Sequence, residues 1–179
     1  MRIRFDDNIF VFEGYPFAPS AAYNEAPIPL EELVSADLPA EKGSGWLEHT
    51  SGELIFVDAL NWYRVQRLME AHDVPSVHRL RVWPLLLYTF QDTVPIEEFS
   101  EDGDARLAQS GFDSEEVHRI QNRVRRRIMT YNSTFWEQRQ LGLYDVLEAH
   151  KFTDRRGEFV AFFEWAMAIA LRGQVLSTQ

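Results

Sequence analysis

The arginine-rich stretch between residues 119 and 127 is the group of side chains with the clearest capacity for binding chemistry. It holds five arginines in a chain whose net charge is −10. At 100° per residue, four of them border one side of a helix and Arg125 lies on the other side; the four are Arg119, Arg123, Arg126 and Arg127. A planar guanidinium binds phosphates and carboxylates equally well. The pattern therefore suits a solvated face or internal pairing with the acidic residues between Glu25 and Glu41, a protein partner, or nucleic acid.

Glu164 is the acid most open to a functional interpretation. It lies in the apolar run from Phe159 to Leu171, which predicts a buried helix. A buried carboxylate is costly unless a base pairs with it or it lines a functional opening. We take Glu164 as a candidate buried acid, with structural pairing to an arginine as the simpler interpretation. A hydrolase-type site around it is the alternative.

Metal, nucleophile and phosphate-loop motifs are incomplete or missing. The chain has no cysteine, which excludes thiolate metal sites and cysteine nucleophiles. Glu115 and His118 have the spacing of a di-iron ligand pair, but the pair occurs once, in a first helical turn where Glu115 opposes the helix dipole. Neither Gly-x-Ser-x-Gly nor a Gly-x-x-x-x-Gly-Lys loop is present. We expect no metal and no cofactor, and the question of catalysis stays open with the balance against it.

The helix that carries the arginines is marked at both the capping and the periodicity level. Gly111 ends a preceding helix over about 95–110, Asp113 has the place of an N-cap, and Glu116 has that of its capping-box partner. Apolar residues then follow at steps of three and four: Val117, Ile120, Val124, Ile128, Tyr131 and Phe135. We expect one helix over 114–136, a short helix over 143–150 after Gly142, and a terminal helix over 155–172.

The first half of the chain favours strands. Alternation around Asp6-Asp7-Asn8 predicts a β-hairpin, and Glu53 to Val57 predicts a strand. We expect a helix from an N-cap at Asp58 to about His72, and a second strand over 77–82. Five of the eight prolines fall in residues 16–45, which predicts a long surface arm with a helical turn near Pro29.

These patterns together predict an α+β protein, with a small mixed β-sheet in the N-terminal half and helices after it. We expect an α+β region over 1–92, with the arm at 16–45, and a helical region over 93–179 packed on it as one continuous domain. The N-terminus lacks the apolar core of a signal peptide, so a cytoplasmic location is expected. The 13-residue run of Phe159–Leu171 is too short to span a membrane.

The expected function is non-enzymatic protein binding, as an adaptor that associates with itself. Aromatic residues crowd the last third of the chain, and aromatics are enriched at protein interfaces. A homodimer through the terminal aromatic helices is therefore the first hypothesis for a partner. Nucleic-acid binding by the helix over 114–136 and a small hydrolase are the alternatives. The charge is uneven, since 1–60 holds eleven acidic and three basic residues while 114–179 holds eight and ten. This asymmetry fits a charged partner as well as neutralisation of the two halves within one fold, so charge does not decide between the hypotheses.

Overall fold

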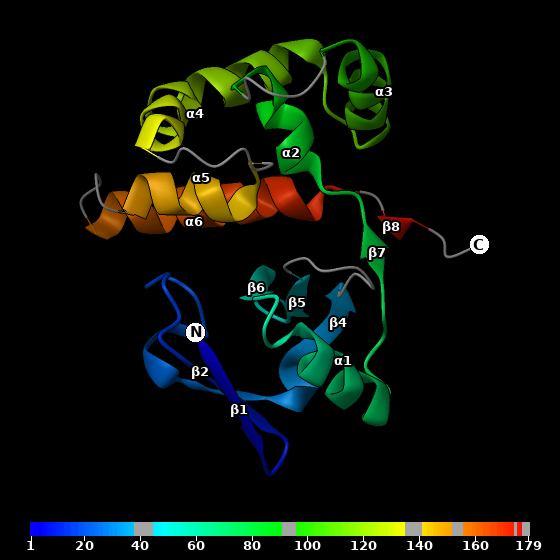
Figure 1. The fold of residues 1–179 in the computed structure, drawn as a ribbon, viewed down its shortest axis with the longest axis vertical. Coiled ribbons are helices and arrows are strands. Elements are labelled where there is room, and N and C mark those ends of the chain that lie inside the picture. Colours follow the sequence, from blue (N-terminus) through cyan, green and yellow to red (C-terminus); the bar gives the residue numbers. More distant parts are fainter. Residues whose placement is uncertain (38–44, 91–95, 135–140, 152–155, 174, 177–179) are drawn as a thin grey trace. The chain divides into compact units, whose positions relative to one another are not determined.

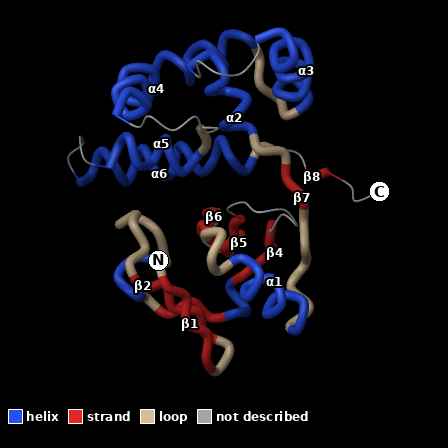
Figure 2. The backbone as a smooth tube through the Cα atoms, in the orientation of Figure 1, coloured by secondary structure: helices blue, strands red, loops and turns tan. Residues whose placement is uncertain are grey.

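A computed structural model describes residues 1–37, 45–90, 96–134, 141–151, 156–173 and 175–176. The chain divides into two compact units, one of residues 1–79 with 175–179 and the other of residues 80–174. All strands of the described residues belong to the first unit, and five of the described α-helices belong to the second (Figures 1 and 2). The α+β class is therefore confirmed.

The first sheet of the first unit is built on the predicted hairpin. Strands β1 (Arg2–Asp6) and β2 (Ile9–Glu13) pair antiparallel, and β3 (Pro27–Pro29) pairs antiparallel with β2. The turn residues Asp7 and Asn8 have φ of 48° and 62°, the left-handed values that a tight two-residue hairpin turn requires. The alternation places Phe10 and Phe12 in the core of this unit.

The second sheet has the order β4-β5-β6, formed by Leu33–Asp37, Gly45–His49 and Glu53–Val57, and both of its pairings are antiparallel. Every residue of β6 is buried, as expected for a strand with this apolar content. Among the described residues, the only parallel pairing is an isolated bridge between Ala36 of β4 and Ser76, which belongs to no strand. The small sheet content of the N-terminal half is thus two three-stranded sheets.

The segment over 16–45, which we predict to be a long surface arm, is described as far as Asp37 and again at Gly45, and its residues 38–44 lie outside the described residues. The described part of this segment contains short 3₁₀ turns at Tyr23–Glu25 and Leu30–Glu32, in addition to β3 and β4. The two prolines of β3 did not prevent strand pairing, because β3 is an edge strand and one of its sides needs no backbone donor. The helical turn expected near Pro29 is confirmed as the second 3₁₀ turn.

Helix α1 (Trp62–Ala71) begins four residues after the predicted N-cap. The Asp58 carboxylate accepts hydrogen bonds from the backbone N–H groups of Leu60 (3.1 Å) and Asn61 (3.0 Å), so it closes a turn before the helix. The strand expected over 77–82 is reduced to β7 (His78–Arg79), which pairs antiparallel with β8 (Val175–Leu176). Val82 already begins the next helix.

The second unit is helical. Its elements are α2 (Val82–Leu87), a 3₁₀ turn (Tyr88–Phe90), α3 (Ile96–Gln109), α4 (Ser114–Thr134), α5 (Leu143–Lys151) and α6 (Arg156–Leu171). Helix α5 lies between α4 and α6 and contacts both, and α2 contacts α3, α4 and α6 (Figure 1). Among the described residues, no helix combines the length and the apolar content needed to cross a membrane.

Helix α2 explains why the division falls at residues 79/80 and not at 92/93 as expected. Five of its six residues are buried apolar side chains, and the Trp83 indole N–H donates to the carbonyl of Ala166 in α6 (3.1 Å). An apolar helix of this kind is stable only where neighbours cover it on most sides. Residues 80–92 therefore belong with the helices that follow.

The start of α4 is fixed by local capping and by Arg172, near the C-terminal end of the second unit. Asp113 caps it as predicted, since its carboxylate accepts the N–H of Glu116 (2.7 Å), and Gly111 has a φ of +79°. The carboxylate of Glu116 does not close the predicted capping box. It binds Arg172 at the end of α6 through two hydrogen bonds, of 2.6 and 3.0 Å. Arg172 also donates to the Gly111 carbonyl and lies 3.6 Å from the ring centre of Phe112.

Candidate functional site

Helix α4 separates an apolar stripe from a polar face, as its sequence predicts. Ile120, Val124 and Ile128 are at most 4% exposed. The side chains between these positions face outward because steps of three and four keep the apolar residues on one stripe. Phe135, the last residue of the predicted stripe, lies outside the described residues.

The four arginines predicted to border one side of this helix do not form one uniform cationic surface. The Arg123 guanidinium lies 4.0 Å from the ring centre of Trp165 and 5.6 Å from that of Phe162, so it packs on aromatic rings of α6. Arg127 is half-buried and makes an interaction within the chain. Arg119 and Arg126 are exposed, and among the described residues neither has a recorded partner.

A groove opens on α4 beside the end of α2 and encloses about 530 Å³. Thr89 and Phe90 of the 3₁₀ turn form one wall. Seven residues of α4 form the other: His118, Gln121, Asn122, Arg125, Met129, Asn132 and Ser133. Arg125, which the helical wheel separates from the other four arginines, is the one that lines this groove.

Two amide side chains of α4 hold the walls of the groove together. The Gln121 amide donates to the Leu86 carbonyl (3.1 Å), and the Asn132 amide donates to the Phe90 carbonyl (3.3 Å). Carbonyls at the end of a helix lack intrahelical donors, so these contacts satisfy groups that would otherwise need water. Their amide oxygens keep their capacity to accept hydrogen bonds.

The described lining of the groove includes one arginine and no acidic residue. That arginine, Arg125, is exposed. The exposed imidazole of His118 donates from Nδ1 to the Ser114 carbonyl (2.6 Å), which leaves Nε2 free of that bond. The lining thus offers a guanidinium, amide groups and an imidazole to a ligand.

Glu164 is not a buried acid, and that prediction was wrong. The residue is exposed on α6, while its neighbours Phe162, Phe163 and Ala166 are buried. A strongly apolar helix still has one outward-facing position per turn, and Glu164 occupies such a position. The hydrolase hypothesis built on a buried Glu164 therefore loses its basis.

The aromatic residues of α6 that suggested a dimer face are largely buried in the chain. Phe159, Phe162 and Phe163 are at most 6% exposed. The Phe162 ring also stacks on the imidazole of His150 in α5, with ring centres 3.7 Å apart. These three rings form part of a core and offer little surface to a partner, while Tyr144 and Val160 of the same helices are each 39% exposed.

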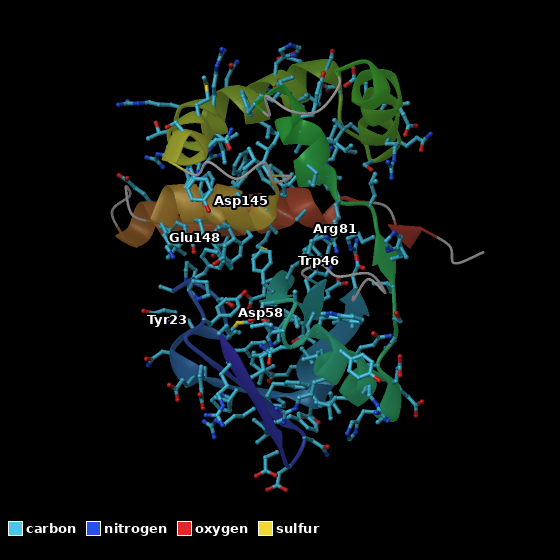
Figure 3. All side chains as sticks on the ribbon, viewed as in Figure 1. Tyr23, Trp46, Asp58, Arg81, Asp145 and Glu148 are labelled. Atoms are coloured by element: carbon cyan, nitrogen blue, oxygen red, sulfur yellow. The ribbon has the colours of Figure 1, made fainter. Side chains whose placement is uncertain are left out.

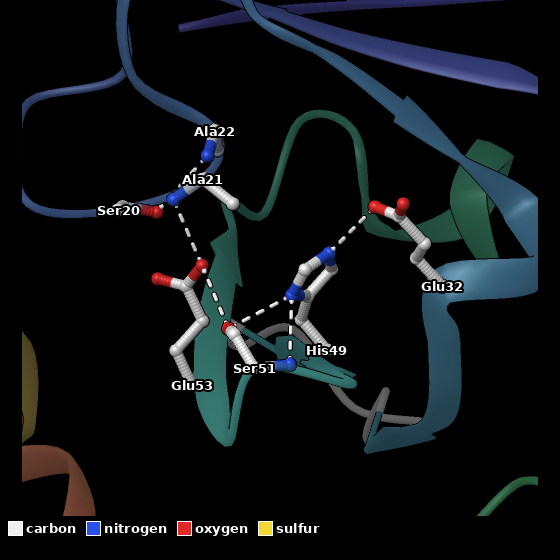
Figure 4. A network of polar contacts seen from close by, with 7 residues as sticks. All are labelled: Ser20, Ala21, Ala22, Glu32, His49, Ser51 and Glu53. Carbon is white, nitrogen blue, oxygen red and sulfur yellow. Dashed lines mark hydrogen bonds and ion pairs between the residues drawn. The ribbon is translucent and has the colours of Figure 1, made fainter.

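A second polar cluster lies in the first unit, around the turn between β5 and β6 (Figure 4). The His49 ring is 3.0 Å from Glu32 through Nε2 and 2.8 Å from the Ser51 hydroxyl through Nδ1. Serine hydrolases join the same residue types, but there the serine contacts Nε2 and the acid contacts Nδ1, the reverse of the arrangement here. Ser51 also lies 3.5 Å from Oε1 of the buried Glu53.

The hydrogen bonds of this cluster favour a structural role. The backbone N–H of Ser51 donates to Nδ1 of His49 (3.1 Å), so the lone pair that would deprotonate the Ser51 hydroxyl is already engaged. Glu53 accepts the backbone N–H of Ala21 (2.8 Å), which ties the residues after Phe17 to the second sheet. The polar residues at the alternating positions 49, 51 and 53 are a sequence signal for part of this cluster. No sequence pattern near the turn identifies Glu32 or Ala21 as their partners.

Two tyrosines of the second unit have raised pKa values. Partial burial, followed by the charge of Glu148 and a hydrogen bond to it, raises the pKa of Tyr144 well above its ordinary value. Burial, followed by the charge of Asp104, raises the pKa of Tyr88. Both tyrosines are therefore neutral at neutral pH and supply no phenolate.

Glu148 and Asp145 are labelled on α5 in Figure 3, and Asp145 accepts the N–H of Gly142 (2.9 Å) at the start of that helix.

The described residues contain no group of three acidic or histidine side chains placed to hold a metal ion. Comparison with models of protein families, with curated proteins and with solved structures found no match for this chain. The function must therefore be inferred from the site geometry alone.

Proposed function

We propose that this protein binds protein partners without catalysing a reaction, and that the α4 groove is its binding surface. The ligand would be an extended peptide segment that carries carboxylates. The observation behind the proposal is the composition of the groove, in which Arg125 and amide side chains face a space of about 530 Å³ and no described lining residue is acidic. That volume falls within the range of ordinary ligand sites.

The dimensions of the groove suit a short peptide. Its lining on α4 runs from His118 to Ser133, a helical length of roughly 22 Å at 1.5 Å per residue. An extended peptide rises about 3.3 Å per residue, so about seven residues match this length. An extended peptide of about seven residues therefore matches the length of the groove along the helix axis.

The side chains also match peptide chemistry. The amide of Asn122 offers one acceptor and two donors, which complement a peptide N–H and C=O. Arg125 can bind a carboxylate through two parallel hydrogen bonds. Met129, which is 51% exposed, offers a flexible apolar contact to a ligand side chain.

The groove lacks the arrangement expected for nucleophilic catalysis. The Ser133 hydroxyl donates to the Thr130 carbonyl (2.8 Å), and His118 Nδ1 is bonded to Ser114. An activated nucleophile requires a base within hydrogen-bond reach of its proton. His118 and Ser133 lie roughly 22 Å apart along the axis of α4, so the imidazole is out of reach of the Ser133 proton, which supports binding over reaction.

Nucleic-acid binding is the second candidate, and the exposure of Arg119 and Arg126 favours it. Phosphate binding would use the whole cationic face of α4, whereas peptide binding would use the groove. Variants on the two surfaces therefore distinguish the candidates.

A binding measurement with defined peptides tests the proposal. We would titrate the protein against a fluorescein-labelled heptapeptide of alternating Glu and Leu at about 50 mM salt, where charge effects are strong, and follow fluorescence anisotropy. The matching Gln-Leu peptide is the ligand control. We expect the Glu peptide to bind at least about tenfold more tightly, which corresponds to one retained charge-assisted contact.

The variants are chosen to separate the groove from the general charge of α4. Arg125→Glu should abolish binding, whereas Arg126→Glu changes the charge equally on an exposed neighbour outside the groove lining and should have little effect. Equal losses in the two variants would contradict a groove site and favour a diffuse cationic face. The absence of binding to either peptide at about 1 mM protein, an affinity limit near −4 kcal/mol, would contradict the proposed function.

A further inference from the structure

The turn between β1 and β2 is an exposed, acidic and conformationally fixed projection. We call residues Asp6, Asp7, Asn8 and Ile9 the acidic tip. All four are exposed, and Ile9 is 37% exposed. The left-handed φ values of Asp7 and Asn8 and the full pairing of β1 with β2 hold this turn in one shape. Among the described residues, neither aspartate has a recorded partner.

The acidic tip and the α4 groove are complementary in charge and in polarity. The tip offers two carboxylates, one amide and one apolar side chain. The groove offers the guanidinium of Arg125, the amide of Asn122 and the exposed side chain of Met129. Helix α4 as a whole carries five arginines against two glutamates, while 1–60 has eleven acidic and three basic residues.

We propose that the acidic tip of a second copy of this chain is the segment that occupies the α4 groove. This inference rests on the proposed function and names its partner. Arg125 pairs with a tip carboxylate, Asn122 bonds the exposed turn backbone, and Met129 contacts Ile9. A preformed turn loses little conformational freedom on binding, which favours it over a flexible acidic segment.

The contact joins unlike surfaces, so the stoichiometry follows from how it is repeated. Reciprocal exchange of tips closes a two-fold dimer, and one-way insertion generates open chains. In both cases self-association depends on the same tip residues and the same groove residues. The aromatic core of α6 has no part in it.

Sedimentation velocity of the full chain at about 1–200 μM protein and about 50 mM salt tests the inference. We expect concentration-dependent association that Arg125→Glu weakens by at least about tenfold, the loss of one charge-assisted contact. Asp6→Lys should weaken it to a similar extent. Asp7→Asn, which keeps a residue that tolerates the left-handed turn, should weaken it less. Two controls change charge at exposed positions outside the contact, Arg126→Glu on α4 and Glu31→Lys in the first unit, and should leave association unchanged.

A mixing experiment adds a result that loss of fold cannot imitate. The Asp6→Lys and Arg125→Glu proteins should each associate poorly alone, and together they should associate better than either, because the tip of the first now matches the groove of the second in charge. Circular dichroism of each variant checks that it is folded.

The outcomes separate the two proposals. A strict monomer at 200 μM together with binding of the Glu-Leu peptide would overturn self-association and leave the groove proposal standing. Association that ignores both the tip and the groove variants would also overturn the inference and place the contact elsewhere, for example on the edge strand β1. An unchanged protein that neither binds the Glu-Leu peptide nor self-associates would overturn the two proposals together.

Discussion

Replacement of Arg172 by alanine should loosen the junction between α3 and α4. Contacts with three residues are lost: the two hydrogen bonds to Glu116, the bond to the Gly111 carbonyl, and the stacking on Phe112. The Arg172 and Glu116 side chains are 33% and 30% exposed, so the pair itself contributes only about 0.5–1 kcal/mol. The carbonyl bond adds about 1 kcal/mol, and the cation–π contact about 0.5–1 kcal/mol.

The expected total is therefore a loss of about 2–3 kcal/mol in the free energy of unfolding of the helical unit. Urea unfolding followed by circular dichroism at 222 nm measures it, with a shift of the midpoint by roughly 1 M for a typical slope. Arg172→Lys keeps the charge but not the planar fork, and should recover less than half of the loss. Arg106→Ala is the control, because its pair with Asp102 is 3.8 Å long and exposed, and it should cost at most about 0.5 kcal/mol.

A double-mutant cycle isolates the ion pair from the other contacts. Glu116→Gln combined with Arg172→Ala should show a coupling of about 0.5–1 kcal/mol, smaller than the whole effect of Arg172→Ala. If the free energy of unfolding of Arg172→Ala lies within about 0.5 kcal/mol of that of the unchanged protein, the contacts of Arg172 do not stabilise the junction and the reasoning fails.

Two further predictions concern charge. The pKa of Tyr144 is higher in the folded chain than in the unfolded chain, so the neutral phenol stabilises the fold. This contribution is fully present below the unfolded pKa of about 10. It is lost as the pH rises from about 10 toward the folded pKa. Alkaline titration of absorbance at 295 nm should show a late-titrating tyrosine that Tyr144→Phe removes; an unchanged titration in that variant would contradict it. In a gel-shift titration at about 50 mM salt we expect no binding to single- or double-stranded DNA. A shift with a log–log salt slope near −3.6 would instead indicate four phosphate contacts, one for each of the arginines at 119, 123, 126 and 127.

Local signals in the sequence predicted the elements that depend on near neighbours. Gly111, Asp113 and the apolar stripe of α4 were identified because a left-handed residue, a cap and a 3.6-residue period act within a few positions. The hairpin at Asp7 and Asn8 was found for the same reason. Such signals describe a segment without its partners.

The features that sequence reasoning missed depend on residues far apart in the chain. Glu116 satisfies a local capping pattern, yet its carboxylate binds Arg172, 56 positions away. Glu164 belongs to an apolar run, but only the packing of α6 shows which position of each turn faces outward. The strand pairing of Pro27 and Pro29 likewise required a neighbouring strand, β2, that proline composition does not reveal.

The candidate site illustrates the same limit. The helical wheel grouped Arg119, Arg123, Arg126 and Arg127, and treated Arg125 as the exception. The groove exists because α2 and its 3₁₀ turn pack on the side of α4 where Arg125 lies, and Gln121 and Asn132 fix that packing through backbone carbonyls. A charge pattern on one helix cannot show where the neighbouring helix will be.

The pairing of β7 with β8 gives the helical unit the topology of an insertion. Arg79, the last residue before it, is the register partner of Val175, which follows it. Entry and exit of the inserted segment are thus held side by side by one short ladder. During synthesis β7 emerges long before β8, so the ladder cannot form until the ribosome has made all of α2 to α6. The first unit can build its two three-stranded sheets early, but it completes its last strand pair only after the whole helical segment has been translated.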